Sequence, residues 1–341
     1  MEQLQYHEGR TEISHLGRVA LVDRLTAGTA CQGDDCAVLG TGKRRQLATV
    51  QTLVEGVDFD MMYTPLRHLG YKAVAVALSN IAAMNGTPRQ VLVSVAVSNR
   101  YSVEALDELY AGIHLCCKRY DVSLVGGDTA STRAGMVLGV TALGDVEADR
   151  LTLRKGAKRN DLVCCSGDLG SAYAGLLVLE REKVTYQANP DFQPDLDGFD
   201  YVLERFLKPE PRTDIVEALR QRGVVPTAMT DVSEGLADSL LHLCRASGVG
   251  CEVYEERLPI DYQTSRVCSE MGKNMLPVSC ALNGGKDYEL LFTVDQKDYG
   301  QVKEMEGVHI IGYVTEAGMP AVMVTPQNTT IELVAQGFSR Q

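Results

Sequence analysis

Four segments of the sequence place glycine next to acidic residues, a combination that can bind phosphate groups and divalent cations. They are Gly33-Asp34-Asp35, Gly126-Gly127-Asp128, Thr230-Asp231-Val232-Ser233-Glu234-Gly235 and Gly284-Gly285-Lys286-Asp287. Glycine lets backbone amides approach a phosphate, and a neighbouring carboxylate supplies the oxygen ligands that magnesium prefers. The chain contains neither the phosphate loop G-x-x-x-x-G-K-S/T nor the glycine-rich loop and H-R-D motif of protein kinases. A nucleotide site built from these segments therefore requires a different fold.

Each segment also has a simple structural explanation. Residues 33–35 could form only a polar turn before a strand, and residues 126–127 only a tight turn. Ser233 or Glu234 could cap the helix that follows, and Lys286 could face solvent rather than a phosphate. Because the four segments are spread over both halves of the chain, their combination favours one composite site for nucleotide, metal and substrate.

Hydrophobic periodicity predicts the elements that must position these turns. In the first half, strands are expected at 46–54, 91–97, 124–125 and 136–143, and helices at 69–84 and 103–118. In the second half, strands are expected at 161–166, before 231 and at 250–254, with helices after 170, at 214–221 and at 236–247. This pattern predicts an α+β protein of two domains, an N-terminal domain with a mixed sheet and a C-terminal α/β domain.

We place the domain boundary near residue 150, where charge density rises, giving domains of residues 1–150 and 151–341. Residues 185–200 are polar and rich in turn-forming residues, so we expect a loop or lid there. Arg212 follows the proline-rich turn 208–211, and we expect it to be a surface residue rather than a ligand.

Charge and hydropathy exclude several classes of function. The chain has 33 basic and 45 acidic residues, a net charge of −12, which disfavours nucleic acid as a partner. No apolar run approaches the roughly 20 residues that a membrane span needs. Residues 1–7 lack a basic segment followed by an apolar one, so we expect no secretory signal and a cytoplasmic location.

The ten cysteines are expected to be reduced, buried thiols. Two adjacent pairs, at 116–117 and 164–165, lie in apolar stretches, and neighbouring cysteines form poor disulfides. The chain has no C-x-x-C pair and its six histidines are scattered, so the spacing of a structural zinc site is missing.

Taken together, the motifs resemble the family that includes thiamine-monophosphate kinase, aminoimidazole-ribonucleotide synthetase, selenophosphate synthetase and a hydrogenase maturation protein. The resemblance is carried in order by residues 33–38, Leu53-Val54-Glu55-Gly56-Val57, residues 78–86, Gly126-Gly127-Asp128-Thr129, residues 209–212 and residues 284–292. Within the family, residues 53–56 and the run Asp287-Tyr288-Glu289-Leu290-Leu291-Phe292 are most similar to the thiamine-monophosphate kinases.

The resemblance implies a fold, an assembly and a reaction. It implies an N-terminal sheet that pairs with a second subunit into a barrel, and hence a homodimer, with a C-terminal α/β domain packed against it. It also implies direct transfer of the ATP γ-phosphoryl group to thiamine phosphate, assisted by magnesium and without a covalent enzyme intermediate. Such a transfer needs mainly in-line positioning and neutralisation of charge.

Residue roles carried over by position complete this expectation. The metal ligands would be Asp35, Thr49, Asp128, Asp231 and Glu234, with Asp128 and Asp231 as catalytic residues. The nucleotide contacts would be Tyr110, Gly127, Asp128, Arg154 and Ser233. The substrate contacts would be Asp58, Lys286 and Phe338.

The chain departs from the family pattern at five positions in these same motifs. Gln51 and Asn80 stand where the family usually has aspartate, and Glu234 is a longer acid in place of a second aspartate. Asp58 replaces a usual histidine and Lys286 a usual glutamate. Amides neutralise crowded phosphates and metals less well than carboxylates, so nucleotide binding is expected more firmly than turnover.

Three interpretations of the sequence remain. The first is a thiamine-monophosphate kinase, fully or weakly active. The second is a non-catalytic homologue that binds nucleotide, because of the substitutions at Gln51, Asn80, Asp58 and Lys286. The third is a family enzyme with another phosphorylated substrate, including an amidine-forming ligase of the purine type.

Overall fold

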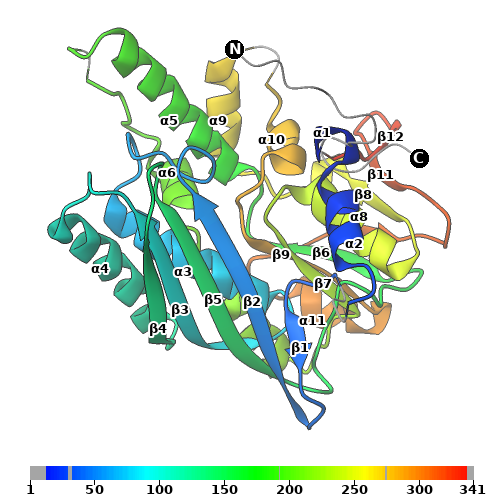
Figure 1. Cartoon of the computed structure of the whole chain (residues 1–341). Helices are drawn as coiled ribbons and strands as arrows, with labels where there is room; N and C mark the ends of the chain where they lie inside the picture. The colour runs from blue at the N-terminus through cyan, green and yellow to red at the C-terminus, as the bar shows by residue number, and fades with distance from the viewer. Residues whose placement is uncertain (1–12, 30–32, 192, 273–274, 336–341) are drawn as a thin grey trace, which may run out of the picture.

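The protein forms two β-sheets, each with its own helices, as the computed structural model shows (Figure 1). The structure describes residues 13–29, 33–191, 193–272 and 275–335. The predicted two-domain α+β architecture is confirmed, because the first sheet comes entirely from the first half of the chain and the second sheet from the second half.

The first sheet has five strands in the order β1-β2-β5-β3-β4. The strands are β1 (Ala37–Leu39), β2 (Arg44–Val54), β3 (Thr87–Val97), β4 (Ser123–Ser131) and β5 (Val137–Glu147). The β3–β4 pair is parallel and the other pairs are antiparallel, so the sheet is mixed. This order places β1 and β4 at opposite edges.

Helices α3 (Leu66–Ala82) and α4 (Val103–Arg119) cover one face of this sheet (Figure 1). Alternate residues of β3, such as Val91 and Val93, point toward them and are buried. The two helices approach closely because glycines lie at their crossing: a Cβ on Gly70 would lie 1.9 Å from the Leu109 carbonyl oxygen.

The opposite face of the first sheet carries no helix of the described residues in Figure 1. Side chains on this face of β2 are exposed, including Val50 at 69% and Val54 at 37%. Monomeric proteins rarely leave an apolar sheet face open, so this face is a candidate contact surface.

The second sheet has seven strands in the order β12-β11-β8-β10-β6-β9-β7. They are β6 (Leu162–Ser166), β7 (Ala228–Val232), β8 (Cys251–Tyr254), β9 (Glu289–Val294), β10 (Val308–Val314), β11 (Ala321–Val324) and β12 (Thr330–Glu332). Every residue of β7 and β9 is buried, as expected for strands covered on both faces. Two separate hydrophobic clusters, one on each side of these strands, provide that cover.

The remaining helices, except the first two, come from the second half of the chain. They are α1 (Ile13–Leu16), α2 (Arg18–Thr26), α5 (Ser171–Ala188), α6 (Asp200–Leu207), α7 (Thr213–Gln221), α8 (Leu236–Ser247), α9 (Tyr262–Met271), α10 (Pro277–Asn283) and α11 (Tyr299–Lys303), with short 3-10 helices at Glu255–Arg257 and Gln296–Asp298. Although α1 and α2 come first in the chain, they lie beside α8 of the second domain (Figure 1).

The sheets are joined through α3. Its C-terminal residue Ala82 and the adjacent Ala83 belong to the hydrophobic cluster that packs on β9 and α7 of the second domain. One helix therefore packs on both sheets, which fixes the relative position of the turns that precede and follow it.

Several expectations from the sequence need adjustment. The expected loop at 185–200 is shorter, because α5 continues to Ala188 and α6 begins at Asp200. The helices α9 and α10 were not predicted. The nine described cysteines are free and buried, as predicted. Among the described residues, no helix is long and apolar enough to cross a membrane.

Candidate active site

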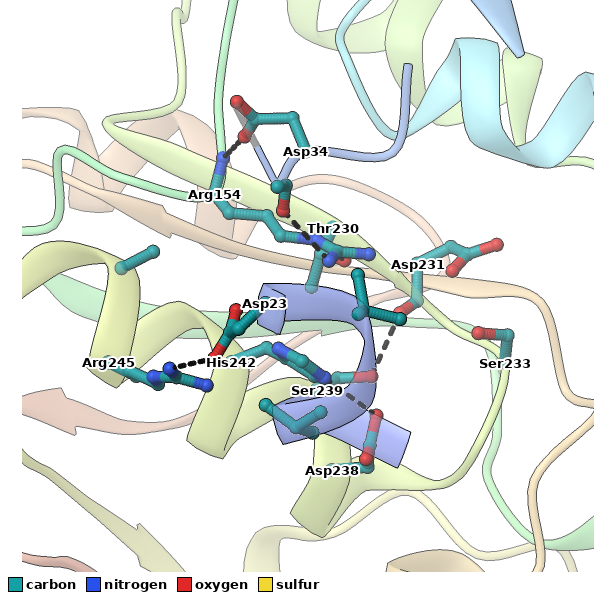
Figure 2. Close-up of a pocket in the computed structure, with 14 residues that line it drawn as sticks. Asp23, Asp34, Arg154, Thr230, Asp231, Ser233, Asp238, Ser239, His242 and Arg245 are labelled. Atoms are coloured by element: carbon teal, nitrogen blue, oxygen red, sulfur yellow. Dashed lines mark hydrogen bonds and ion pairs between the residues drawn. The ribbon is translucent and has the colours of Figure 1, made fainter. Parts of the chain in front are cut away.

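Two adjoining cavities lie where the turns of the two domains meet. The larger has a volume of about 480 Å³ and runs between α2, α8 and the end of β7 (Figure 2). The smaller, about 230 Å³, extends toward β2 and α3 of the first domain. Asp34, Arg154, Asp231 and Ser233 line both cavities, so the two form one continuous site.

Arg154 ties the first glycine–acid turn to the second domain. Its guanidinium forms an ion pair with Asp35 at 2.5 Å and donates to Thr230 Oγ1 at 3.2 Å. Its backbone N–H donates to Asp34 Oδ1 at 2.8 Å, and Nη1 donates to the Gly33 carbonyl oxygen at 3.1 Å. The segment 33–35 is therefore part of the site and not only a polar turn before β1.

Asp231, at the end of β7, is buried between the domains. Ser79 Oγ of α3 donates to its carboxylate at 2.8 Å, and Ser239 Oγ of α8 donates to its backbone carbonyl oxygen at 2.8 Å. Burial, together with the nearby negative charge of Asp35, raises the pKa of Asp231 from 3.8 to about 7. A cation bound beside Asp231 would stabilise the ionised form of its carboxyl group.

The smaller cavity brings together the predicted residues of the first domain. Asn80 Nδ2 donates to Thr49 Oγ1 at 2.9 Å, and Gln51 lies two residues further along β2 on the same face. Glu234 and Lys286 line the same cavity from the second domain. Oxygen atoms from both domains therefore surround one small volume.

Asp58 and Lys286 contact each other across the domain boundary. The Lys286 ammonium lies 3.2 Å from Asp58 Oδ1, and Asp58 Oδ2 accepts a hydrogen bond from the Val54 N–H at 3.0 Å. These residues are the two positions where the sequence reverses the usual charge of the family. In the structure the two reversals form one ion pair of opposite charges.

The glycine-rich turn before β9 has an unusual backbone. Gly285, Lys286 and Tyr288 all have positive φ, at 73°, 67° and 53°. A Cβ at Gly285 would lie 2.8 Å from the Ser233 carbonyl oxygen, which explains the glycine. The Lys286 N–H donates to the same carbonyl at 2.7 Å. Positive φ in non-glycine residues costs energy and is often found at functional sites.

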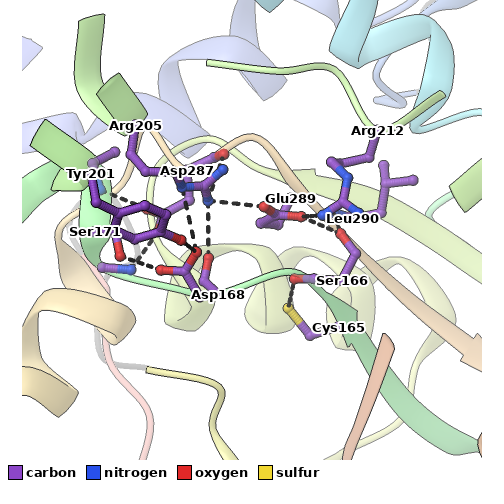
Figure 3. Close-up of polar contacts among 12 residues, drawn as sticks. Cys165, Ser166, Asp168, Ser171, Tyr201, Arg205, Arg212, Asp287, Glu289 and Leu290 are labelled. Carbon is purple, nitrogen blue, oxygen red and sulfur yellow. Dashed lines mark hydrogen bonds and ion pairs between the residues drawn. The ribbon is translucent and has the colours of Figure 1, made fainter. Parts of the chain in front are cut away.

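Acidic residues after this turn have structural partners (Figure 3). Asp287 accepts hydrogen bonds from the Gly170 N–H at 2.8 Å and the Ala172 N–H at 3.2 Å, so it holds the N-terminus of α5. Glu289 pairs with Arg205 at 2.9 Å and with Arg212 at 2.5 Å. The expectation that Arg212 is a surface residue is wrong: its side chain is only 15% exposed because it binds Glu289.

The structure does not bring all the predicted residues together within one chain. Gly127 and Asp128 lie on β4, the edge of the first sheet opposite β1, and Tyr110 lies on α4. Three strand spacings of about 4.8 Å separate β4 from β2, or roughly 14 Å. Ligands of one magnesium ion lie about 2.1 Å from it, so Asp128 and Thr49 of one chain do not share an ion.

Two further expectations concern Phe338 and the predicted metal ligands. Phe338 lies outside the described residues. Among the described residues, no group of three or more His, Cys, Asp or Glu side chains forms a preassembled metal-binding cluster. Asp35, one of the predicted metal ligands, is instead paired with Arg154.

Several residues that line the site were not identified from the sequence. Asp238 and His242 of α8 line the larger cavity (Figure 2), and His242 Nε2 lies 3.7 Å from Asp238 Oδ2. Their spacing of four residues on a predicted helix was the available signal. Thr230 and Ser79 lie in segments that the sequence singled out, but their contacts with Arg154 and Asp231 depend on packing between distant segments.

Comparison with known proteins identifies the family. The AIR synthase related protein N-terminal domain matches residues 33–146, and the corresponding C-terminal domain matches residues 166–325. Thiamine-monophosphate kinase of Bacillus subtilis is 35% identical over 90% of this chain and 92% of its own length. The enzyme of Aquifex aeolicus is 32% identical over 89% of this chain and 97% of its own length.

Solved structures agree with these sequence matches. AaThiL complexed with AMPPCP and TMP superposes with a TM-score of 0.83 at 27% identity, covering 97% of this chain and 99% of that one. The hydrogenase maturation protein HypE in complex with ATP shares the fold, with a TM-score of 0.69 at 17% identity over 97% and 96% of the two chains. The chain therefore belongs to the thiamine-monophosphate kinases, a family of kinase enzymes built from the two AIR synthase related domains.

Proposed function

We propose that this chain transfers the γ-phosphoryl group of ATP to thiamine monophosphate and forms thiamine diphosphate. The observation that carries the proposal is the continuous site in which Asp34, Arg154, Asp231 and Ser233 line both cavities. The related AaThiL was solved with AMPPCP and TMP, so a relative with the same fold holds a nucleotide analogue and TMP together. The two adjoining cavities of this chain are suited to two such ligands.

Within this proposal, Arg154 and Ser233 contact the phosphates of the nucleotide. Arg154 is the cation that borders both cavities, and Ser233 lies at the end of β7, just before α8. Backbone amides at such a strand-to-helix turn favour negative groups. The acceptor phosphate oxygen attacks the γ-phosphorus while the bond to ADP breaks, and the residues around it hold both substrates in line.

The donor atoms of the site fit magnesium. Thr49, Asp35, Asp231 and Glu234 all border the smaller cavity and offer hydroxyl or carboxylate oxygens, which are hard ligands. Burial and the charge of Asp35 raise the pKa of Asp231, so a cation bound beside it would favour its ionised form. When bound, magnesium supplies neutralisation of charge on the phosphates; the chain's own residues position it.

We propose that the enzyme is a homodimer in which the exposed faces of the two first sheets form a barrel. The open apolar face with Val50 and Val54 supports this assembly. So does the position of Asp128 and Gly127 at the far edge of the sheet, because a second copy can bring them, with Tyr110, to a site that they do not reach within their own chain.

We also propose that the domains comprise residues 1–150 and 151–341. The last strand of the first sheet ends at Glu147, and the first strand of the second sheet begins at Leu162. Arg154 lies in this connection, so the segment that joins the domains also contributes to the proposed site.

A non-catalytic, nucleotide-binding protein is the second candidate. Gln51 and Asn80 border the smaller cavity without the charge of an aspartate, and Asp35 is already paired with Arg154. A family enzyme that acts on another phosphorylated substrate is the third candidate, and binding of ATP without binding of thiamine phosphate would favour it.

A coupled assay for thiamine diphosphate tests the proposal directly. The purified chain is incubated with ATP, magnesium and thiamine phosphate, with Arg154→Gln as the matched variant. We expect product from the unmodified chain and at least about a hundredfold less from the variant, because a charge-assisted phosphate contact is lost. Absence of product together with measurable binding of Mg-ATP would favour the non-catalytic homologue.

A further inference from the structure

Positive charge in the smaller cavity is confined to two places. Four carboxyl groups border the cavity: Asp34, Asp35, Asp231 and Glu234. The cations that line it are Arg154, which also borders the larger cavity, and Lys286, which lines only the smaller one. A reaction between two phosphate-bearing substrates needs two phosphate positions, and these two cations are the candidates for binding them.

Lys286 is held rigidly at its position. Its N–H is bound to the Ser233 carbonyl oxygen at 2.7 Å, and its backbone is in the left-handed region with φ of 67°. Its ammonium group contacts Asp58, which is itself fixed by the Val54 N–H. An ammonium group has three donors, and one contact with Asp58 leaves donors for a ligand. The side chain keeps 27% of its surface exposed.

A second lysine, buried in α3, lies near this pair. Lys72 of α3 is only 2% exposed, and its ammonium has no hydrogen-bond partner among the described residues. It lies 3.9 Å from the centre of the Phe206 ring, a favourable position for a cation. Lys286 and Asp58 both act on the titration of Lys72, so the three groups are within electrostatic reach of one another. Asp58 therefore lies in contact with Lys286 and within electrostatic reach of Lys72.

We propose that Lys286 binds the phosphate group of the phosphorylated acceptor, and that Asp58 positions the Lys286 side chain for this contact. The inference rests on the proposed function and deepens it by assigning the acceptor phosphate to the end of the smaller cavity. Recognition of the acceptor at this position then depends on its phosphate rather than on its cationic ring, which a lysine repels.

Isothermal titration with two ligands that differ only in the phosphate tests this assignment. Thiamine phosphate and thiamine are titrated into the full-length chain and into Lys286→Gln. We expect Lys286→Gln to weaken binding of thiamine phosphate roughly tenfold or more and binding of thiamine less than about twofold, because a hydrogen bond to a charged group is lost only with the first ligand. Equal weakening for both ligands, or none for either, would overturn the proposal.

Two further variants separate a phosphate contact from a structural role. Lys286→Arg keeps the charge and is expected to retain the preference for thiamine phosphate. Lys183→Gln removes another ion pair between the domains, with Asp60 at 2.9 Å and similar exposure, but does not line the cavity. We expect this variant to bind both ligands like the unmodified chain, and a loss as large as that of Lys286→Gln would contradict the proposal.

Inorganic phosphate is the probe that separates this inference from the proposed function. If phosphate binds in a manner that depends on Lys286 while thiamine phosphate does not bind, the anion site stands and thiamine phosphate is rejected as the acceptor. If neither phosphate nor thiamine phosphate binding depends on Lys286, the anion site is rejected, whatever the outcome of the kinase assay.

Discussion

Ser79 Oγ of the first domain donates a hydrogen bond of 2.8 Å to the Asp231 carboxylate of the second, and both residues are buried. Because Ser79 lies in α3, which packs on both sheets, this bond links the helix that joins the domains to the centre of the proposed site. The geometry of the site therefore depends on the packing of the two domains.

We expect Ser79→Ala to lower the free energy of unfolding by about 1–3 kcal/mol, because the variant leaves a buried carboxyl group with one partner fewer. Urea unfolding measures the change. Ser269→Ala is a suitable control, since the Ser269 hydroxyl donates to a helix carbonyl in an exposed position. If both variants lowered the free energy of unfolding equally, the bond between Ser79 and Asp231 would contribute no more to stability than an exposed hydrogen bond.

Asp128 and Asp231 are expected to act on the same site from different subunits. Asp128→Asn and Asp231→Asn homodimers should each be nearly inactive and fail to bind Mg-ATP strongly. After mixing and exchange of subunits, about half of the dimers contain one chain of each kind, and one of their two sites is intact.

The mixture should thus recover about a quarter of the activity of the unmodified enzyme. The coupled assay measures this recovery, and mixing either variant with itself is the control. No recovery after verified subunit exchange would place both residues in the site of one chain, against the positions of β4 and β2 in the sheet.

Restoring aspartate at the two amide positions tests whether lost charge limits turnover. The double variant Gln51→Asp with Asn80→Asp adds two carboxylates beside Thr49 in the smaller cavity. We expect kcat to rise by about tenfold or more at saturating magnesium, because carboxylates are better magnesium ligands than amides. Unchanged kcat with normal Mg-ATP binding would show that the amides do not limit the reaction.

Lys72 predicts a distinct dependence of stability on pH. Burial, with Lys286 as a smaller contribution, lowers the pKa of Lys72 from 10.5 to about 7. The folded protein therefore binds fewer protons than the unfolded chain between these values, and the contribution of Lys72 to stability increases as pH rises from about 7 toward 10.5. Below about pH 7 the cost of burying the charge is greatest.

Lys72→Met should remove this dependence. At about pH 7 we expect the variant to be more stable than the unmodified chain by roughly 1–3 kcal/mol, with the difference shrinking toward about pH 10. Denaturant unfolding at several pH values measures the difference, with Lys183→Met as the control because Lys183 is paired with Asp60. A difference that does not change with pH would show that Lys72 titrates normally.

Local sequence patterns predicted much of the fold and the main parts of the site. Alternation of apolar residues located β2 and β5, and helical spacing located α4 and α8, because these patterns depend on neighbours along the chain. The glycine–acid turns at 33–35 and 230–235 were identified as candidate ligand sites, and both line the larger cavity. The shorter α9 and α10 were missed because their periodicity is brief and their ends lack strong signals.

Contacts between distant segments could not be read from the sequence. Asp58 and Lys286 were both predicted as substrate contacts that depart from the family pattern, but their pairing with each other across 228 residues of chain was not predicted. Arg212 was predicted to be a surface residue, because the sequence does not show that Glu289 of β9 lies beside it in the fold.

Local patterns and motifs indicated most of the elements, the family and the residue types available for phosphate and metal chemistry. Which of these residues meet depends on the folded chain: Asp35 contacts Arg154 and Ser79 contacts Asp231, whereas Asp128 lies at the far edge of its sheet. The reason is physical: periodicity reflects interactions between neighbours along the chain, whereas strand order and domain packing arise from burial between segments that are distant in sequence.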